Sequence, residues 1–139
     1  MAIQTIATLK ANMPIGAVGG TSVQDIHDIV DTFAELTTQE VLAKTASYSA
    51  VVGDNNRFVT MSVATANTFT VPSTAPVGWE CAVFQIGVGQ TTIAVGGTGA
   101  LRHPDSHTKI LKQYGMIYLK VYANAGTAPQ VAFTGDTAL

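Results

Sequence analysis

Cysteine, charge and long apolar runs are all scarce in this chain of 139 residues, and each shortage excludes a class of protein. Cys81 is the only cysteine, so no disulfide can form within the chain, and its apolar surroundings (81–86) predict a buried, inert thiol. No run approaches the roughly 18 apolar residues of a membrane span, and residues 1–20 lack the charged start and apolar block of a secretory signal. We therefore expect a soluble protein that is made in the cytoplasm and has no membrane partner.

Charged residues make up only 12% of the chain, against about 25% in an ordinary soluble domain, while apolar residues make up 47%. A weakly charged polar surface is typical of a subunit whose neighbours cover it in a permanent assembly. The formal net charge of -2 gives no basic face, so we expect no nucleic-acid partner. Four of the seven basic residues lie within 102–120, a stretch that is either a solvated loop or a partner for an acidic neighbour.

Residues 21–36 are the segment whose apolar residues follow a helical spacing. They recur every three or four positions, which predicts one stripe along an amphipathic helix. The stripe consists of Val23, Ile26, Val30, Phe33 and Leu36. It is too short for a coiled coil that stands alone, so it must bury against the chain's own β-domain, other copies of the chain or another protein. We assign this stripe to anchoring and oligomerisation.

After residue 47 the apolar spacing becomes alternating, which predicts short strands separated by turns rich in Gly, Pro and Asn. The expected strands are 48–52, 57–63, 68–71, 80–86, 91–95, 116–122 and 130–133, with 80–86 and 91–95 joined as a hairpin. Such a series is typical of an antiparallel β-sandwich or a small barrel. The predicted organisation is an N-terminal arm and hinge (1–20), a helix and connector (21–46) and a β-domain (47–139).

Catalytic motifs are missing from the sequence. The glycine-rich turns 87–90 and 96–99 lack the lysine of a phosphate-binding P-loop, and no serine lies in a nucleophile elbow. A glycoside-cleaving carboxylate pair stays open, with the candidates Asp54, Glu80, Asp105 and Asp136. The leading expectation is a protein that is not an enzyme and uses no cofactor.

The segment 103–107 has two histidines and an aspartate at alternate positions. Side chains of these types bind transition metals, and this spacing lets His103, Asp105 and His107 converge on one ion. Exposed loop histidines produce the same pattern. We expect no bound metal, and these three residues are the candidate ligands if one is bound.

Several aromatic residues of the β-region can stack on the apolar face of a sugar ring, namely Tyr48, Trp79, Tyr114, Tyr118 and Tyr122. Alternation within 116–122 turns Ile117, Leu119 and Val121 inward, so Tyr118 and Tyr122 point outward and are the candidates for facing a glycan. The alternative is a structural role for these rings, with Trp79 in the core or in an interface.

Five short segments carry a resemblance to a known group of proteins. They are Thr68–Pro72, Pro76–Gly78, Phe84–Ala94, Lys109–Gly115 and Thr134–Asp136. In this order they resemble a β-domain found in structural proteins of tailed bacteriophages and prophages, which include tail fibres, head fibres or spikes, and decoration proteins. The match spans about residues 48–136, and the segment 19–30 also resembles the start of such proteins. Members of this group commonly have tryptophan where this chain has Phe133.

The resemblance implies a non-enzymatic virion component with a head, neck or tail location. The expected partners are further copies of the chain in a homotrimer, other virion proteins of the capsid, portal or tail, and a host surface glycan. Since the chain has no long shaft, a short fibre or spike, a fibre base or a decoration subunit fits better than a complete fibre. The alternative function is a carbohydrate-binding module that recognises bacterial surface glycans.

Overall fold

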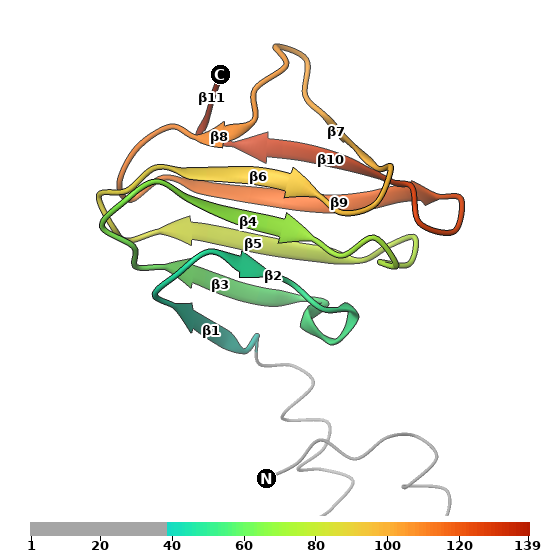
Figure 1. Ribbon diagram of the computed structural model, residues 1–139, viewed down its shortest axis with the longest axis horizontal. Helices are drawn as coiled ribbons and strands as arrows, with labels where there is room; N and C mark the ends of the chain where they lie inside the picture. The colour runs from blue at the N-terminus through green and yellow to red at the C-terminus, as the bar shows by residue number, and fades with distance from the viewer. Residues whose placement is uncertain (1–38) are drawn as a thin grey trace, which may run out of the picture. The chain divides into compact units, whose positions relative to one another are not determined.

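A computed structural model describes residues 39–139 (Figure 1). The helix expected over 21–36, with its stripe Val23, Ile26, Val30, Phe33 and Leu36, lies outside the described residues. The described part is mainly β. Its strands are β1 (Val41–Lys44), β2 (Tyr48–Ser49), β3 (Arg57–Met61), β4 (Asn67–Val71), β5 (Glu80–Gln85), β6 (Thr91–Val95), β7 (Ala100–Arg102), β8 (Lys109–Ile110), β9 (Met116–Asn124), β10 (Pro129–Gly135) and β11 (Thr137–Ala138), with one 3-10 turn at Val52–Asp54.

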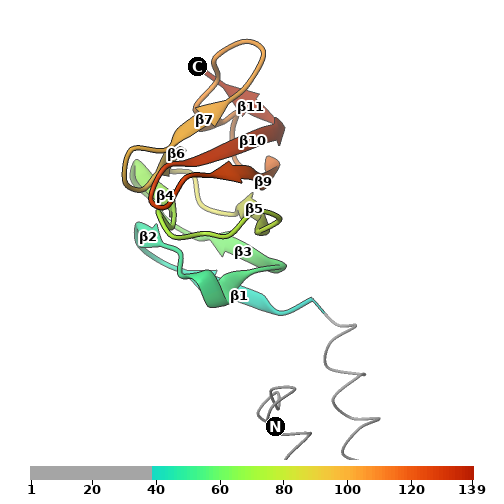
Figure 2. The same cartoon turned by 90° about the vertical axis from the view of Figure 1, so that its right-hand side faces the viewer.

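The strands form two mixed sheets. The six-stranded sheet has the order β1-β3-β5-β9-β10-β7, and the five-stranded sheet has the order β11-β8-β6-β4-β2. Successive strands from β1 to β9 alternate between the two sheets, so the chain winds back and forth across the core (Figure 2). Each of β3, β4, β5 and β6 therefore pairs in parallel with the strand two positions earlier.

The expectation of an antiparallel fold is wrong for this first half of the domain. Antiparallel pairing appears only later, where β9 pairs with β5 and β10, and where β8 pairs with β6 and β11. Alternation of apolar residues predicts a strand with one buried face, but it is the same for parallel and antiparallel neighbours. The sequence pattern therefore located strands without showing their direction.

The segment 86–90 is not a hairpin, because the strands that it joins belong to different sheets. It is an arch that stacks on the preceding arch, residues 62–66. The amide of Gly87 donates to Met61 O (3.0 Å) and the amide of Gly89 donates to Val63 O (2.9 Å). A Cβ atom at either glycine would overlap the backbone of the arch below, so only glycine permits this contact.

Both sheets contribute to one hydrophobic core. In β9 the side chains of Ile117, Leu119 and Val121 are buried, whereas Tyr118 and Tyr122 are exposed, which confirms the predicted alternation. Trp79 and Cys81 are each 1% exposed, so both lie in the core. The indole N–H of Trp79 donates to Val52 O (3.2 Å).

A buried polar network holds the arch 86–90 in place. Gln85 Oε1 accepts a hydrogen bond from the amide of Thr91 (2.9 Å), and Thr91 Oγ1 donates to Asn67 Oδ1 (2.8 Å). The Asn67 amide in turn donates to Thr65 O (3.0 Å) and Gly89 O (3.2 Å). Because Gln85, Asn67 and Thr91 are all buried, these bonds satisfy polar groups that water cannot reach.

Candidate functional site

The outer face of the six-stranded sheet carries a row of aromatic side chains, which we call the aromatic strip: Phe58 on β3, Phe84 on β5 and Tyr114 in the turn before β9. The ring centroids of Phe58 and Phe84 are 6.0 Å apart, and those of Phe84 and Tyr114 are 6.4 Å apart. In each pair the ring planes are inclined by 35°. Such spacing and tilt are ordinary for packed aromatic rings.

Cross-strand pairing assembles this row. The pairing of β3 with β5 aligns Phe58 with Ala82, and the pairing of β5 with β9 aligns Ala82 with Tyr118 and Phe84 with Met116. Met116 is 48% exposed and Tyr118 is 39% exposed, so they widen the apolar surface on the β9 side. Ala82, with a small side chain, lies between Phe58 and Tyr118 in this register.

Tyr114 has an unusual backbone conformation. Its φ angle is +65°, and its side chain is 66% exposed. The amide of Tyr114 donates to Gln85 O (2.7 Å) and that of Gly115 donates to Lys112 O (2.9 Å), so the turn is tied to the end of β5. A left-handed conformation costs a residue with a Cβ atom about 1–2 kcal/mol. Strain of this kind tends to occur at functional sites.

A surface cavity of about 540 Å³ adjoins Tyr114 and is lined by Leu111, Lys112, Gln113, Tyr114, Gly115 and Asp136. The carboxylate of Asp136 is held in place because its Oδ2 accepts from the amide of Met116 (3.0 Å). The side-chain amide of Gln113 donates to Ile86 O (2.9 Å). The cavity thus combines an aromatic wall with an ammonium group, an amide and a carboxylate.

A polar cluster lies beside the strip on the same face. The Tyr118 hydroxyl donates to Glu80 Oε2, and Lys120 Nζ lies 3.1 Å from the same oxygen. The hydrogen bonds from Tyr118 and then from Lys120 lower the pKa of Glu80, and the bond to Glu80 is the main cause that raises the pKa of Tyr118 to about 12. Glu80 and Lys120 neutralise each other, so this part of the face has no net charge.

Both tyrosines predicted to face a glycan are exposed on β9. Tyr118 lies next to the aromatic strip, while Tyr122 is 52% exposed and stands further along the strand, beyond Lys120. Sequence reasoning missed Phe58 and Phe84, because no local pattern indicates that β3 and β5 are neighbours. The sequence held one signal for stacked arches, the pair Gly87 and Gly89, because glycine allows two backbone segments to lie close together.

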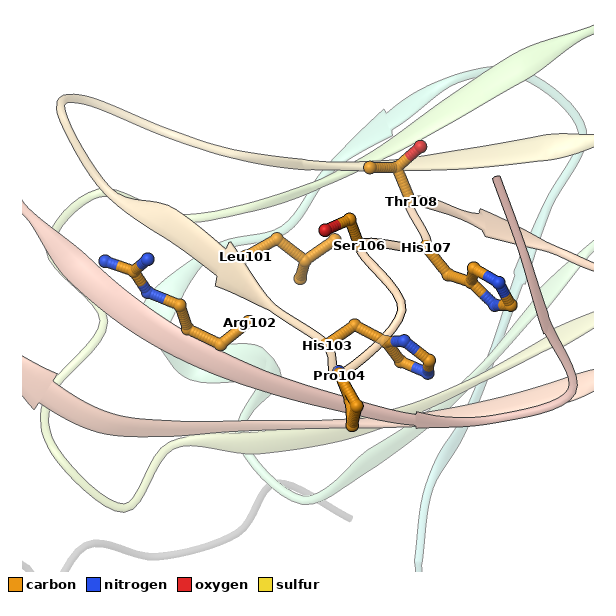
Figure 3. A pocket seen from close by; sticks show the side chains of 7 residues that line it. All are labelled: Leu101, Arg102, His103, Pro104, Ser106, His107 and Thr108. Carbon is orange, nitrogen blue, oxygen red and sulfur yellow. The ribbon is translucent and has the colours of Figure 1, made fainter.

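The candidate metal ligands lie in the loop between β7 and β8 (Figure 3). The rings of His103 and His107 are stacked, with centroids 4.6 Å apart and planes inclined by 8°. Thr137 Oγ1 lies between them, 3.1 Å from His103 Nε2 and 2.8 Å from His107 Nδ1. A cavity of about 460 Å³ adjoins this loop, and in Figure 3 Arg102 points away from the two rings.

Hydrogen bonding assigns the tautomers of this pair. The backbone amide of Asp105 donates to His103 Nδ1 (3.1 Å), so the proton of His103 is on Nε2 and is donated to Thr137 Oγ1. The hydroxyl of Thr137 can then donate to His107 Nδ1. Asp105 contributes its amide to this chain of bonds. Within residues 39–139, no three His, Cys, Asp or Glu residues are grouped so that they could hold a metal ion.

The candidate acid Asp54 and the thiol of Cys81 have structural roles. Asp54 is buried and its Oδ2 accepts from the Tyr48 hydroxyl (2.7 Å) and the Val51 amide (2.9 Å), which closes the turn before β3. Burial raises the pKa of the Cys81 thiol to about 12, so the thiolate is disfavoured there. Burial and the bond to Asp54 likewise raise the pKa of Tyr48 to about 12.

Comparison with known proteins gave no match to a protein family, to a curated protein or to a solved structure. In the described part of the chain, no helix has the length and apolar character that a bilayer crossing requires.

Proposed function

We propose that this chain is a non-enzymatic structural subunit of a tailed-phage particle, anchored through its N-terminal region and displaying a two-sheet β-sandwich. A short fibre or spike, a fibre base or a decoration subunit is the form that we propose. One observation carries the proposal: several residues of the segments that carry the phage resemblance make contacts that hold the fold together.

The arch and its surroundings show this most clearly. Gly87 and Gly89 permit backbone contact between arches, and Gln85 satisfies the buried amide of Thr91. Gln90 Nε2 donates to Ile110 O (3.0 Å), and Asp136 accepts from the start of β9. A resemblance that consists of fold-building residues supports an architectural role better than a catalytic one.

Self-association is the second part of the proposal, and a homotrimer is the state we expect. In the described part, β1 and β2 each have a neighbouring strand on one side only. Val41 on β1 is 59% exposed. Open strand edges and an apolar stripe at residues 23–36 are surfaces that further copies of the chain can cover.

Light scattering on the purified full chain tests this directly. We expect a mass about three times the 14.4 kDa of one chain at micromolar concentration. The double variant V30D/F33D should be monomeric with unchanged Trp79 fluorescence. The control D31N, a change outside the apolar stripe expected from the sequence, should keep the native mass. A native chain that stays monomeric, or a double variant that stays trimeric, contradicts the proposal. Electron microscopy of the particle with density assigned to this chain tests the virion location.

Carbohydrate recognition is a second candidate function, favoured by the exposed aromatic side chains on the outer face of the six-stranded sheet. It is compatible with display, since a displayed domain meets the host surface first. A pull-down with the full chain on host envelope fractions and a glycan array test it. Retention on neither would leave only the architectural role.

A further inference from the structure

We propose that the aromatic strip and the adjoining cavity form one binding site for a neutral oligosaccharide of pyranose units. This inference rests on the second candidate function, carbohydrate recognition, and locates the binding site on the domain. The site is centred on Tyr114, with Phe84 and Phe58 as further stacking positions and with Lys112, Gln113 and Asp136 as hydrogen-bonding groups.

The apolar half of the site matches the apolar faces of successive sugar rings. Three aromatic rings follow one another at 6.0 and 6.4 Å, a spacing comparable to the length of one pyranose unit. The rings of each pair are inclined by 35°, so they suit a single flexible chain better than a flat crystalline surface. Aromatic faces of this kind supply contact area with little loss of side-chain entropy.

The polar half of the site matches sugar hydroxyls, which both donate and accept hydrogen bonds. Lys112 is a donor. Asp136 uses one bond to hold Met116, and a carboxylate has room for several, so it can also accept from a ligand. Gln113 donates to Ile86 O and keeps its own side-chain oxygen as an acceptor. An aromatic wall with a few fixed polar groups is the usual composition of a small-ligand site.

The charges around the site favour a neutral ligand over an anionic one. Glu80 and Lys120 are paired beside the strip, and Lys112 and Asp136 line the same cavity with opposite signs. No surplus of positive charge is therefore present to attract an acidic polymer.

The strained conformation of Tyr114 is the independent observation. The other non-glycine residues with positive φ in the described part are Asn56 and Ser106, both small and polar. Glycine would adopt this conformation without cost, yet the chain has an exposed tyrosine there. Tyr114 has a strained backbone conformation and an exposed ring, and contact between this ring and a ligand explains why a tyrosine occupies this position.

The test uses the full chain with cellohexaose and chitohexaose as probes, and titration calorimetry as the readout. We expect at least one of the two to bind, and Tyr114→Ala to weaken its binding about tenfold or more, as the loss of one stacking contact implies. Tyr114→Phe should bind within about twofold of the native chain, because it keeps the ring. The control is Val77→Ala, which removes an exposed apolar side chain in the turn before β5 and should bind within about twofold of the native chain. Tyr122→Ala tests the other placement, on the outward tyrosines of β9.

A second variant separates a binding role from a folding role. Tyr114→Gly should unfold at a urea concentration no lower than that of the native chain, because it relieves the strain, and should still lose binding. Each contrary result overturns the proposal. If neither probe binds, the site is not a glycan site. If Tyr122→Ala loses binding and Tyr114→Ala does not, carbohydrate recognition stands and this placement falls. If Tyr114→Ala changes the mass of the assembly, the strip is a subunit interface.

Discussion

Replacing Gln85 by leucine should destabilise the domain by about 2–3 kcal/mol, because it removes the acceptor of a buried amide. Leucine has a similar size and no polar atom, so the core keeps its volume and the change isolates the hydrogen bonds. The side chain of Gln85 is 1% exposed, and Thr91, whose amide it accepts, is fully buried.

The magnitude follows from two lost bonds. The amide of Thr91 loses its 2.9 Å bond to Gln85 Oε1 at a place that water does not reach, which costs about 1–3 kcal/mol. The longer bond from Gln85 Nε2 to Gly87 O (3.3 Å) is only partly buried and adds about 0.5–1 kcal/mol. For a domain of this size, about 2–3 kcal/mol lowers the midpoint of thermal unfolding by roughly 10–20 °C.

Urea unfolding followed by tryptophan fluorescence measures this change, since Trp79 is the only tryptophan and is buried. The matched control is Gln130→Leu, because Gln130 accepts from Arg102 at the surface and its loss should cost less than about 1 kcal/mol. Equal destabilisation by the two variants would refute the reasoning, because it would mean that the buried network does not hold the arch.

Four further predictions concern single sites. Gly89→Ala should destabilise by about 2 kcal/mol or more because its Cβ would overlap a backbone oxygen, whereas Gly53→Ala, with open space around it, should change the urea midpoint little. The hydrogen bonds that lower the pKa of Glu80 stabilise the fold above pH 4.5, the ordinary pKa of this group, and this contribution is lost as pH falls through the lowered pKa. Tyr118→Phe should raise the pKa of Glu80 in an NMR titration, because it removes the main hydrogen bond. An unchanged pKa would contradict the assigned cause. The hydrogen bond to Glu80 raises the pKa of Tyr118 to about 12, so this bond stabilises the fold fully below pH 10 and is lost as pH rises towards 12. An absorbance titration of the tyrosine hydroxyl measures this pKa. The thiol of Cys81 should react with a thiol reagent in urea but not in the native chain, and fast native reaction would argue against its burial.

The positions of the longer strands could be predicted from the sequence, because a strand with one buried face alternates wherever it pairs. The expected segments 57–63, 68–71, 80–86, 91–95, 116–122 and 130–133 overlap β3, β4, β5, β6, β9 and β10. Among the short strands, β2 (Tyr48–Ser49) lies within the expected segment 48–52, whereas β1, β7, β8 and β11 were not predicted. The structure places β1 (Val41–Lys44) within the segment assigned to the connector, and it places β7 (Ala100–Arg102) and β8 (Lys109–Ile110) on either side of residues 103–108. Strands of two to four residues are too short for a period to be recognised.

Strand direction and partners could not be predicted, because they depend on how distant segments meet. Phe58 and Val59 are adjacent in β3, so their side chains point to opposite faces of the sheet. The same holds for Val83 and Phe84 in β5, and Val59 and Val83 are the buried members of the two pairs. This alternation does not show that β3 and β5 lie side by side with their chains parallel. The arch glycines carry that information, but a Gly-x-Gly segment between two strands is equally typical of a hairpin.

The same physics explains why local reasoning found the outward tyrosines of β9 but did not assemble the aromatic strip. Tyr118 and Tyr122 belong to one strand, so their shared outward direction follows from their spacing alone. Phe58, Phe84 and Tyr114 become neighbours only through the parallel pairing of β3 with β5 and the turn that joins Tyr114 to the end of β5. The strained φ angle of Tyr114 also has no sequence signature, because glycine follows it and a turn with glycine in the left-handed position is the default expectation. The residue that breaks this rule is also the one that joins the strip to the cavity, and for that reason it is the first to mutate.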